Sequence, residues 1–424
     1  MHMGKTVKDS LSSDGLFTML LVVITGFVGV APLAVLPAWV GGMMDHLGLS
    51  EQQAGVIASA NLFGSAIGML IVAGLLKHFS LLRLAIMGVG LEVVADLASL
   101  FFDAALQLGC LRFAAGIGGG VVTATAISWI AQQPNPERGY GLFMMLQFGV
   151  GALILAVLPH FMAVNGVNVI YLVFIAFAFL SLVLSPALKC SLKRKIHQGN
   201  DNDGIEVAAE KIKLLPVGLS FVAVGLFEAA NAGVWAYIER VGLAIPLPRD
   251  TLGMILAIAS LVGIPGALAV VWLGIRRGRF LPIAAGLSCG MLSLLLLLGV
   301  DDLLLYMVAI MALSASWSFT LPYLQGIQAQ LDPQGRIAVL GYFVVMVGVA
   351  LGPALYGGVV GSGDYSNAMW LGVLLLVGCL IAIAPVAIAT DQVSDRKQAE
   401  SPTEQLPRVV TKSRHRLKKL LTGI

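Results

Sequence analysis

The side chain best suited to chemistry is a carboxylate inside a long apolar stretch. The stretch runs from Leu214 to about Tyr237, which is long enough to cross a bilayer as a helix, and Glu228 lies near its middle. Asn231 follows one helical turn later. An ionisable group at bilayer depth costs at least about 2.5 kcal/mol, so it usually faces a bundle interior or a wet cavity. Glu228 is therefore the first candidate for a proton-carrying group; the alternative is a carboxylate kept neutral or paired for helix packing.

Three more ionisable side chains lie well inside apolar stretches. Glu92 and Asp96 are four residues apart, so they share one helix face and could hold a proton between them. Arg112 has a fixed charge and needs a partner, which Asp103, Glu92 or Asp96 could supply. All three are candidates for proton coupling. A purely structural ion pair remains open, because buried pairs can set specificity without adding stability.

Aromatic and amide side chains inside the apolar stretches suit the binding of an amphipathic organic solute. The candidates for a solute cavity are Asn231, Trp235, Tyr237, Trp317, Tyr323, Gln325, Asn61 and Gln147. An aromatic residue near a helix end can instead be an interfacial anchor.

Other familiar patterns do not fit their context. The sequence Gly286-Leu287-Ser288-Cys289-Gly290 has the GxSxG spacing of a nucleophile elbow, but it lies within an apolar stretch rather than on a strand-to-helix turn. The glycine run at 116–120 has no strand before it, so close helix packing explains it, Gly64 and Gly68 better than phosphate binding. The four cysteines lie far apart, and all six histidines fall at or beyond the ends of the apolar stretches. We expect no enzyme active site, metal, cofactor, nucleic-acid partner or direct use of ATP.

Composition explains where these side chains must sit. Of the 424 residues, 58% are hydrophobic and only 12% are charged, and the mean hydropathy is +0.91. A soluble domain carries roughly 25% charged residues. Twelve apolar runs, each near the ~20 residues that a spanning helix needs, predict an all-α membrane protein. They are about Leu16–Val40, Gln53–Leu76, Leu82–Phe102, Leu108–Ala131, Gly139–Phe161, Asn168–Ala187, Leu214–Ile238, Leu252–Gly274, Phe280–Val300, Leu304–Gly326, Arg336–Val360 and Asn367–Ala389.

The distribution of positive charge predicts the orientation of these spans. All but three of the 26 Lys and Arg residues lie in the two tails and in the even-numbered connections. The odd-numbered connections hold only Arg240 and Arg249, and Arg112 is inside the fourth span. Lysine and arginine mark the cytoplasmic side of a membrane protein. Both termini are therefore expected in the cytoplasm, and the number of spans is even.

A long polar connection divides the chain into two halves of six spans. We expect a cytoplasmic N-terminal tail (1–15), a first bundle (16–188), a cytoplasmic central loop (189–213), a second bundle (214–390) and a basic cytoplasmic tail (391–424). The halves echo each other weakly, as in many secondary transporters, whose substrate site lies between repeats near the midplane. The last tail reads as disordered, because runs of like charge tend to be so; a surface helix on anionic lipid is the alternative.

Several degenerate motifs accompany this layout, and with them the chain resembles the major facilitator superfamily of secondary transporters. Gly74 to Arg83 sits where the family has its loop motif, with His78 in place of the family's aspartate, and Arg276-Arg277-Gly278-Arg279 looks like the second copy, again without the acid. Arg112-Phe113-Ala114-Ala115-Gly116 is similar to the family's fourth-span motif. The run from Gly348 to Pro353 is similar to a glycine-proline motif of antiporters that usually lies in the fifth span. The resemblance implies gating roles for Gly74, Arg83, Arg276, Arg277, Gly278 and Arg279, and a cavity lined by the first, fourth, seventh and tenth spans.

The function that follows is secondary active transport of a small organic solute. We expect a monomer in a bacterial inner membrane that works by alternating access, with proton-coupled export favoured by the antiporter-like glycines. Uptake of a metabolite such as an organic acid or sugar by proton symport is the nearest alternative. A membrane-embedded enzyme would need a histidine at depth or a metal cluster, and a receptor would usually carry a sizeable soluble domain.

Overall fold

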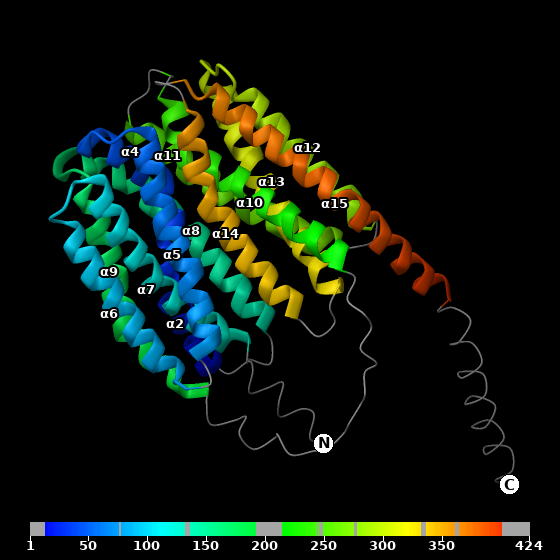
Figure 1. Ribbon diagram of the computed structural model, residues 1–424, viewed down its shortest axis with the longest axis horizontal. Helices are drawn as coiled ribbons and strands as arrows, with labels where there is room; N and C mark the ends of the chain where they lie inside the picture. Colours follow the sequence, from blue (N-terminus) through cyan, green and yellow to red (C-terminus); the bar gives the residue numbers. More distant parts are fainter. Residues whose placement is uncertain are drawn as a thin grey trace, which may run out of the picture.

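The protein is built from helices, as the apolar pattern predicts. The computed structural model describes residues 13–75, 78–131, 136–191, 214–243, 245, 249–274, 278–331, 336–360 and 364–400, and contains no β-strand within them. The N-terminal half comprises α2 (Ser13–Phe27), η1 (Val28–Val30), α3 (Ala31–Ala34), α4 (Leu36–Leu47), α5 (Glu51–Leu75), α6 (Leu81–Ser99), α7 (Ala105–Ala131), α8 (Pro136–Asn165), α9 (Asn168–Leu184) and η2 (Ser185–Ser191). The C-terminal half comprises α10 (Leu214–Gly242), α11 (Arg249–Leu273), α12 (Phe280–Leu296), α13 (Leu303–Leu331), α14 (Arg336–Val359) and α15 (Ser366–Glu400). Figure 1 shows the two halves side by side.

Length and composition make this a multi-pass membrane protein. Ten helical stretches of the described chain are long and apolar enough to cross a membrane. The shorter α12 is also apolar, and α6 carries Arg83, Glu92 and Asp96 within its 19 residues. With these two helices the twelve expected spans are accounted for. Several helices extend beyond their apolar runs, most of all α15, which continues to Glu400 rather than ending near Ala389.

The first span is not one continuous helix. It is interrupted by the 3-10 turn η1 and again at Val35, and Pro32 and Pro37 lie in the first turns of α3 and α4. Proline has no backbone N–H, so it cannot donate to the carbonyl four residues earlier. Pro37 therefore leaves the carbonyl of Leu33 without its usual helical donor, and the backbone N–H of Val35, which is shared with the carbonyl of Ala31, is the nearest backbone donor to it.

Glycines set the closest helix contacts, as the sequence predicts for the run at 116–120. A Cβ added to Gly116 or Gly120 of α7 would lie about 2 Å from backbone oxygens of α5, and Gly64 and Gly68 of α5 face α7 in the same way. In the other half, Gly348 and Gly352 of α14 lie against the backbone of α10. Side chains at these glycines would push the helix pairs apart, as in small-residue interfaces of membrane helices generally.

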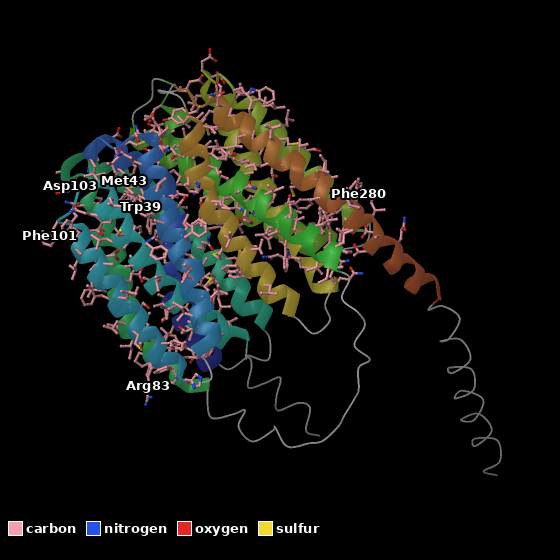
Figure 2. All side chains as sticks on the ribbon, in the orientation of Figure 1. Trp39, Met43, Arg83, Phe101, Asp103 and Phe280 are labelled. Carbon is pink, nitrogen blue, oxygen red and sulfur yellow. The ribbon has the colours of Figure 1, made fainter. Side chains whose placement is uncertain are left out.

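The bundle has two ends, which we call the tail side and the far side. The tail side is where α2 begins and α15 ends, and the far side is where α4 ends and α5 begins. Figure 2 places Arg83, at the start of α6, at the first of these ends and Asp103, just after α6, at the second.

Candidate functional site

A cavity lies between the two halves, and both contribute to its wall. Its empty volume, counting the space that opens to solvent, is about 1310 Å³. The described lining residues are Gly29, Val30, Leu33, Ala34, Leu62, Ser65, Met144, Gln147, Phe148, Glu228, Trp235, Ser260, Ala267, Ser314, Trp317, Ser318, Leu321, Pro322, Gln325, Tyr342, Val345, Met346 and Val349. They come from the first, second, fifth, seventh, eighth, tenth and eleventh spans, so the fourth span, expected from the family resemblance to line the cavity, contributes none of them.

The cavity reaches from the middle of the bundle toward the tail side. Gln325 lies in the last two turns of α13, which ends on the tail side, and Tyr342 lies about two turns into α14, which begins there. At its other end the lining stops at Leu33 and Trp235.

Glu228 faces this cavity from the middle of α10. Its side chain is 1% exposed, and its Oε1 accepts a hydrogen bond of 3.3 Å from the indole Nε1 of Trp317 on α13. The close approach of Gly348 on α14 leaves room beside the Glu228 Cβ, which would lie 2.8 Å from a Cβ added at that glycine. The helix pairing that the glycines allow thus seats the carboxylate, and the indole holds one of its oxygens.

Four of the eight residues expected in a solute cavity line it: Trp235, Trp317, Gln325 and Gln147. The other four are engaged elsewhere. Asn231 donates to the carbonyl of Phe227 in its own helix at 2.8 Å, and the hydroxyl of Tyr323 donates to the carbonyl of Gly274 at 3.0 Å. Asn61 donates to the carbonyl of Arg112 at 2.9 Å, and Tyr237 lies at the far side.

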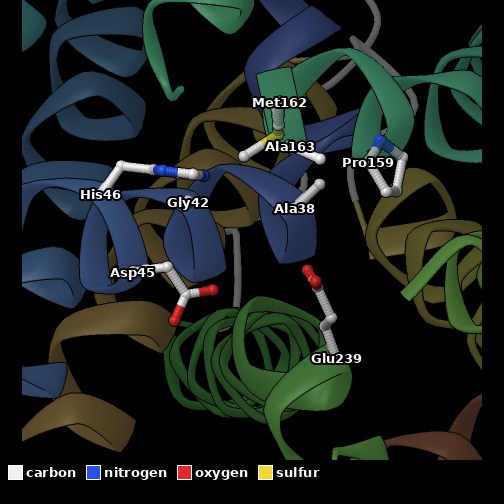
Figure 3. Close-up of a pocket in the computed structure, with 8 residues that line it drawn as sticks. All are labelled: Ala38, Gly42, Asp45, His46, Pro159, Met162, Ala163 and Glu239. Carbon is white, nitrogen blue, oxygen red and sulfur yellow. The ribbon is translucent and has the colours of Figure 1, made fainter. Parts of the chain in front are cut away.

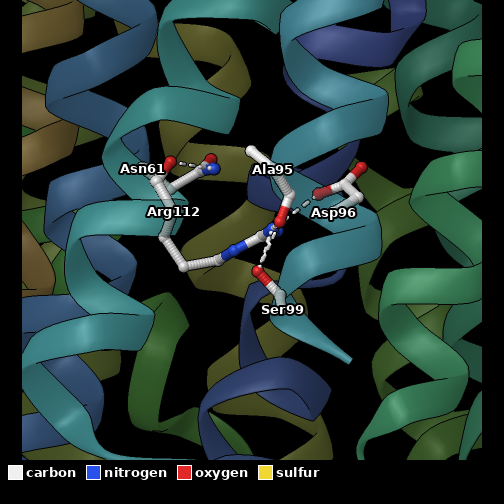
Figure 4. A network of polar contacts seen from close by, with 5 residues as sticks. All are labelled: Asn61, Ala95, Asp96, Ser99 and Arg112. Carbon is white, nitrogen blue, oxygen red and sulfur yellow. Dashed lines mark hydrogen bonds and ion pairs between the residues drawn. The ribbon is translucent and has the colours of Figure 1, made fainter. Parts of the chain in front are cut away.

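Arg112 lies away from the cavity, inside the N-terminal half. Its Nη2 forms a 2.7 Å ion pair with Asp96 Oδ1 and donates to Ser99 Oγ at 2.7 Å and to the carbonyl of Ala95 at 3.2 Å (Figure 4). Its guanidinium carbon is 4.8 Å from the ring centroid of Tyr171 on α9. The guanidinium is fully buried, and these contacts replace only part of the water that it loses, because its Nε and Nη1 have no hydrogen-bond partner among the described residues. Of the three partners that the sequence leaves open, the structure selects Asp96.

Glu92 is buried one turn before Asp96 on the same face of α6. It packs against the glycines of α7: a Cβ added to Gly119 would lie 3.2 Å from Glu92 Oε1 and 2.8 Å from the Cα of Gly29. Gly29 belongs to the cavity wall. Gly119 and Gly29 therefore lie between this second buried carboxylate and the cavity.

Side chains of α10 close the far side by binding the N-terminal half, along a set of contacts that we call the seam. Trp235 Nε1 donates to the carbonyl of Leu33 at 3.3 Å, and the Tyr237 hydroxyl donates to the carbonyl of Glu51 at 2.6 Å. Arg240 forms a 2.9 Å ion pair with Asp45 and also donates to the carbonyl of Gly41.

Two further features belong to the seam. The backbone N–H of Ala354 on α14 donates to the hydroxyl of Ser59 on α5 at 2.9 Å. A small pocket lies beside it, in which Asp45 of α4 points toward α10 and Glu239 of α10 points toward α4 (Figure 3).

Four of the loop residues expected to act in gating, Gly74, Arg83, Gly278 and Arg279, are described, and they lie on the tail side. Gly74 and Arg83 are exposed, and Ser80 accepts a hydrogen bond from the backbone N–H of Arg83. Arg276 and Arg277 lie outside the described residues. Gly278 has a φ of +72°, and the next backbone N–H, that of Arg279, donates to Asp391 at 2.8 Å. The acid that is missing from the loop sequence is thus supplied by the tail-side part of α15.

Sequence reasoning missed the seam and part of the cavity wall. The carbonyl of Leu33 accepts a hydrogen bond from Trp235, and Pro37 is the sequence feature that could have predicted a carbonyl without its helical donor at this position. Nothing in the sequence indicated that Ser65 and Phe148 line the cavity, because a single polar or aromatic residue in an apolar run does not show which side of its helix faces the cavity.

Comparisons with known proteins agree with this architecture. Two helical halves around a central cavity are the architecture of secondary transporters, and Gly286 to Gly290 lie within α12 rather than on a strand-to-helix turn. The family model of the Major Facilitator Superfamily matches residues 16–346. The chain belongs to the Major Facilitator Superfamily. A comparison with curated protein sequences finds no match.

Solved transporters share the fold at low sequence identity. A mutant of the peptide transporter POT has a TM-score of 0.69 at 15% identity, over 88% of this chain and 95% of that one. A mutant of the nucleoside transporter NupG has a TM-score of 0.68 at 13% identity, over 87% and 99%. The xylose transporter XylE from E. coli, in a partially occluded inward open conformation, has a TM-score of 0.66 at 14% identity, over 88% and 98%.

Proposed function

We propose that this transporter exports a small organic solute in exchange for protons, with Glu228 as the group that carries the proton. The observation that supports it is the position of Glu228, a buried carboxylate that faces a cavity between the halves. Ionisable residues inside membrane spans mark substrate and proton pathways by default. Alternating access would then be a movement of the bundle at 16–188 against the bundle at 214–390, around this cavity.

The state of the cavity fits the start of an export cycle. The charge distribution of the sequence assigns the tail side to the cytoplasm, with both termini there. The seam closes the far side, and the cavity extends toward the tail side. In this orientation the cavity would face the cytoplasm, the direction that the name of the inward open XylE structure gives for that protein. A bacterial inner membrane and a monomeric carrier complete the proposal.

Proton symport is the second candidate, because solved neighbours are named for peptide, nucleoside and xylose transport. The glycines of α14, which allow its close contact with α10, favour antiport through their likeness to an antiporter motif. A symporter and an antiporter would use Glu228 in the same way but would move the solute in opposite directions, so direction separates them.

Everted membrane vesicles test coupling and direction together. The solute is a compound from a metabolite and drug library that raises the unfolding temperature of the purified protein, since a ligand of the folded state raises apparent stability. Respiration makes the interior acidic, and an antiporter should then accumulate this compound until nigericin collapses the pH gradient. Glu228→Gln keeps size and hydrogen bonding but cannot titrate, so the variant should insert normally, lose the accumulation and keep downhill exchange.

Asp301→Asn removes an exposed carboxylate outside the cavity and serves as the matched control. Normal accumulation by Glu228→Gln per inserted molecule would refute the coupling role and move the search to Glu92 and Asp96. Expulsion of the compound by the acid-inside gradient would instead establish symport.

A further inference from the structure

One ionisable side chain, Glu228, lies in the described wall of the central cavity. Among the described residues that line the cavity, Glu228 is the only acidic one, and none is a lysine, arginine or histidine. The other polar groups of the wall are amides, hydroxyls and indole N–H groups, which are neutral. The cavity therefore holds one carboxyl group that can become negatively charged, in a mainly apolar wall.

Aromatic rings accompany the carboxylate. Trp235 of α10, Trp317 of α13, Tyr342 of α14 and Phe148 of α8 line the same cavity, so rings come from both halves. The face of an aromatic ring attracts a cation, with tryptophan the strongest, and aromatic cages are a common means of binding quaternary ammonium groups. The bond from Trp317 to Glu228 places one of these rings directly beside the negative charge.

The cost of removing a charge from water decides between substrate classes. A buried charge is tolerated only when it is paired. An anion in this cavity would meet Glu228 and, among the described lining residues, no basic group. A cation would be paired by Glu228 and would lie on the aromatic faces, while the methionines, leucines and valines of the wall would cover an apolar body.

We infer that the substrates are organic monocations with an aromatic or apolar body, such as quaternary or protonated amines. The inference rests on the proposed function, because it takes the cavity to be the substrate site. It excludes the organic acids that the sequence left open as substrates. It also explains how one carboxylate serves two ligands, because a proton and an organic cation would occupy Glu228 in turn.

Two ions of the same shape and opposite charge provide the test. Tetraphenylphosphonium and tetraphenylborate are added separately to the purified full-length protein, and the unfolding temperature is followed by intrinsic fluorescence. The cation should raise the unfolding temperature in proportion to its binding, and the anion should not. Glu228→Gln should weaken the apparent affinity for tetraphenylphosphonium at least tenfold. Glu228→Asp, which keeps a carboxylate on a shorter side chain, should weaken it less than Glu228→Gln does, and the control Asp301→Asn should stay within threefold of wild type.

Equal stabilisation by the two ions, or unchanged affinity in Glu228→Gln, would overturn the inference. If Glu228→Gln does not fold, the two ions on the wild-type protein still decide. The outcome is separate from that of the vesicle experiment. Binding of the cation without gradient-driven transport would refute proton coupling alone, and gradient-driven transport of neutral solutes without binding of the cation would refute the substrate class alone.

Discussion

The helices α7 and α10 are similar in composition but differ in their surroundings. Both are long, contain glycines at close contacts and carry a buried charge, Arg112 in α7 and Glu228 in α10. The neighbours of α7 include α5, α6, α2 and η1, all in its own half, whereas α10 packs on α14, α15 and α13 of its own half and also on α4 of the other. Arg112 is surrounded by partners from its half, and Glu228 faces a space that both halves enclose.

We propose that this difference decides which buried ionisable residues a moving transporter can use. Contacts inside one half, such as those of Arg112, persist when the halves move as bodies, so they serve assembly. Contacts of α10 with the cavity and with the seam change when the halves separate. On this view the charge of α7 holds the structure together, and the polar groups of α10 take part in the cycle.

The largest expected effect is on stability, in Arg112→Ala. Removing one partner of a buried ion pair leaves the other charge uncompensated, which costs about 3–5 kcal/mol. The free energy of unfolding in detergent should fall by this amount, with a lower yield of monodisperse protein. Glu228→Gln should stay within about 1 kcal/mol of wild type, because its hydrogen bond with Trp317 survives.

A double variant sharpens this prediction. Replacing the pair by apolar residues in Arg112→Met with Asp96→Leu removes both charges, and such replacements are often neutral in stability. The double variant should therefore regain most of the loss and still transport. The control is Asp301→Asn, at an exposed position outside both the ion pair and the cavity. A stable double variant that has lost gradient-driven transport would contradict the purely structural role of Arg112, since it would show that Arg112 takes part in the transport cycle.

The next effect is on the far side, in Arg240→Ala. Hydrogen bonds to charged groups contribute about 1.5–3 kcal/mol, so loss of the bonds to Asp45 and Gly41 should favour opening of the seam. Each 1.4 kcal/mol is a factor of about ten in an equilibrium. Leu33→Cys, in a background without the four natural cysteines, should react roughly ten- to hundredfold faster with an impermeant thiol reagent from outside.

Asp301→Ala, which removes a charge on the far side but outside the seam, should leave the rate of labelling unchanged. If Arg240→Ala also leaves it unchanged, the seam contacts of α10 do not hold the far side closed.

The smallest effect is a coupling between Pro37 and Trp235. Pro37→Ala restores a backbone N–H that can take the carbonyl of Leu33, in competition with the indole. Pro37→Ala and Trp235→Phe should each speed the labelling of Leu33→Cys about three- to tenfold, as expected for a hydrogen bond worth about 0.5–1.5 kcal/mol. The double variant should be no faster than either single one, and additive effects would show that the two residues act independently.

Much of the fold can be predicted from the sequence. The length of an apolar run indicates a helix that spans the lipid, and glycines within it indicate where two helix backbones come close together. The runs predict all twelve helices, and the run at 116–120 predicts close helix packing, which the contact of Gly116 with α5 confirms. Three partners were open for Arg112, and only the turn of α6 that brings Asp96 to α7 decides among them.

The cavity wall was harder to predict than the spans. In a soluble helix, polarity marks the exposed face, but in a membrane the buried and the lipid-facing sides are both apolar. Helix rotation therefore leaves a weak trace in the sequence, and Gln147 faces the cavity whereas Asn61 faces α7. The break in the first span needed the context of both halves, since a proline alone does not show which donor will use the carbonyl it frees.

The proline at 37 predicts a pattern of covariation among the sequences of homologous proteins. Because Trp235 binds the backbone oxygen of Leu33, the side chain at position 33 is free to change during evolution without affecting that bond. The pair under joint selection is instead 37 and 235, two positions that share no side-chain hydrogen bond. Homologues that have lost the proline should tend to have lost the indole as well, so the two columns of an alignment should vary together, whichever side chain the cavity requires at position 33.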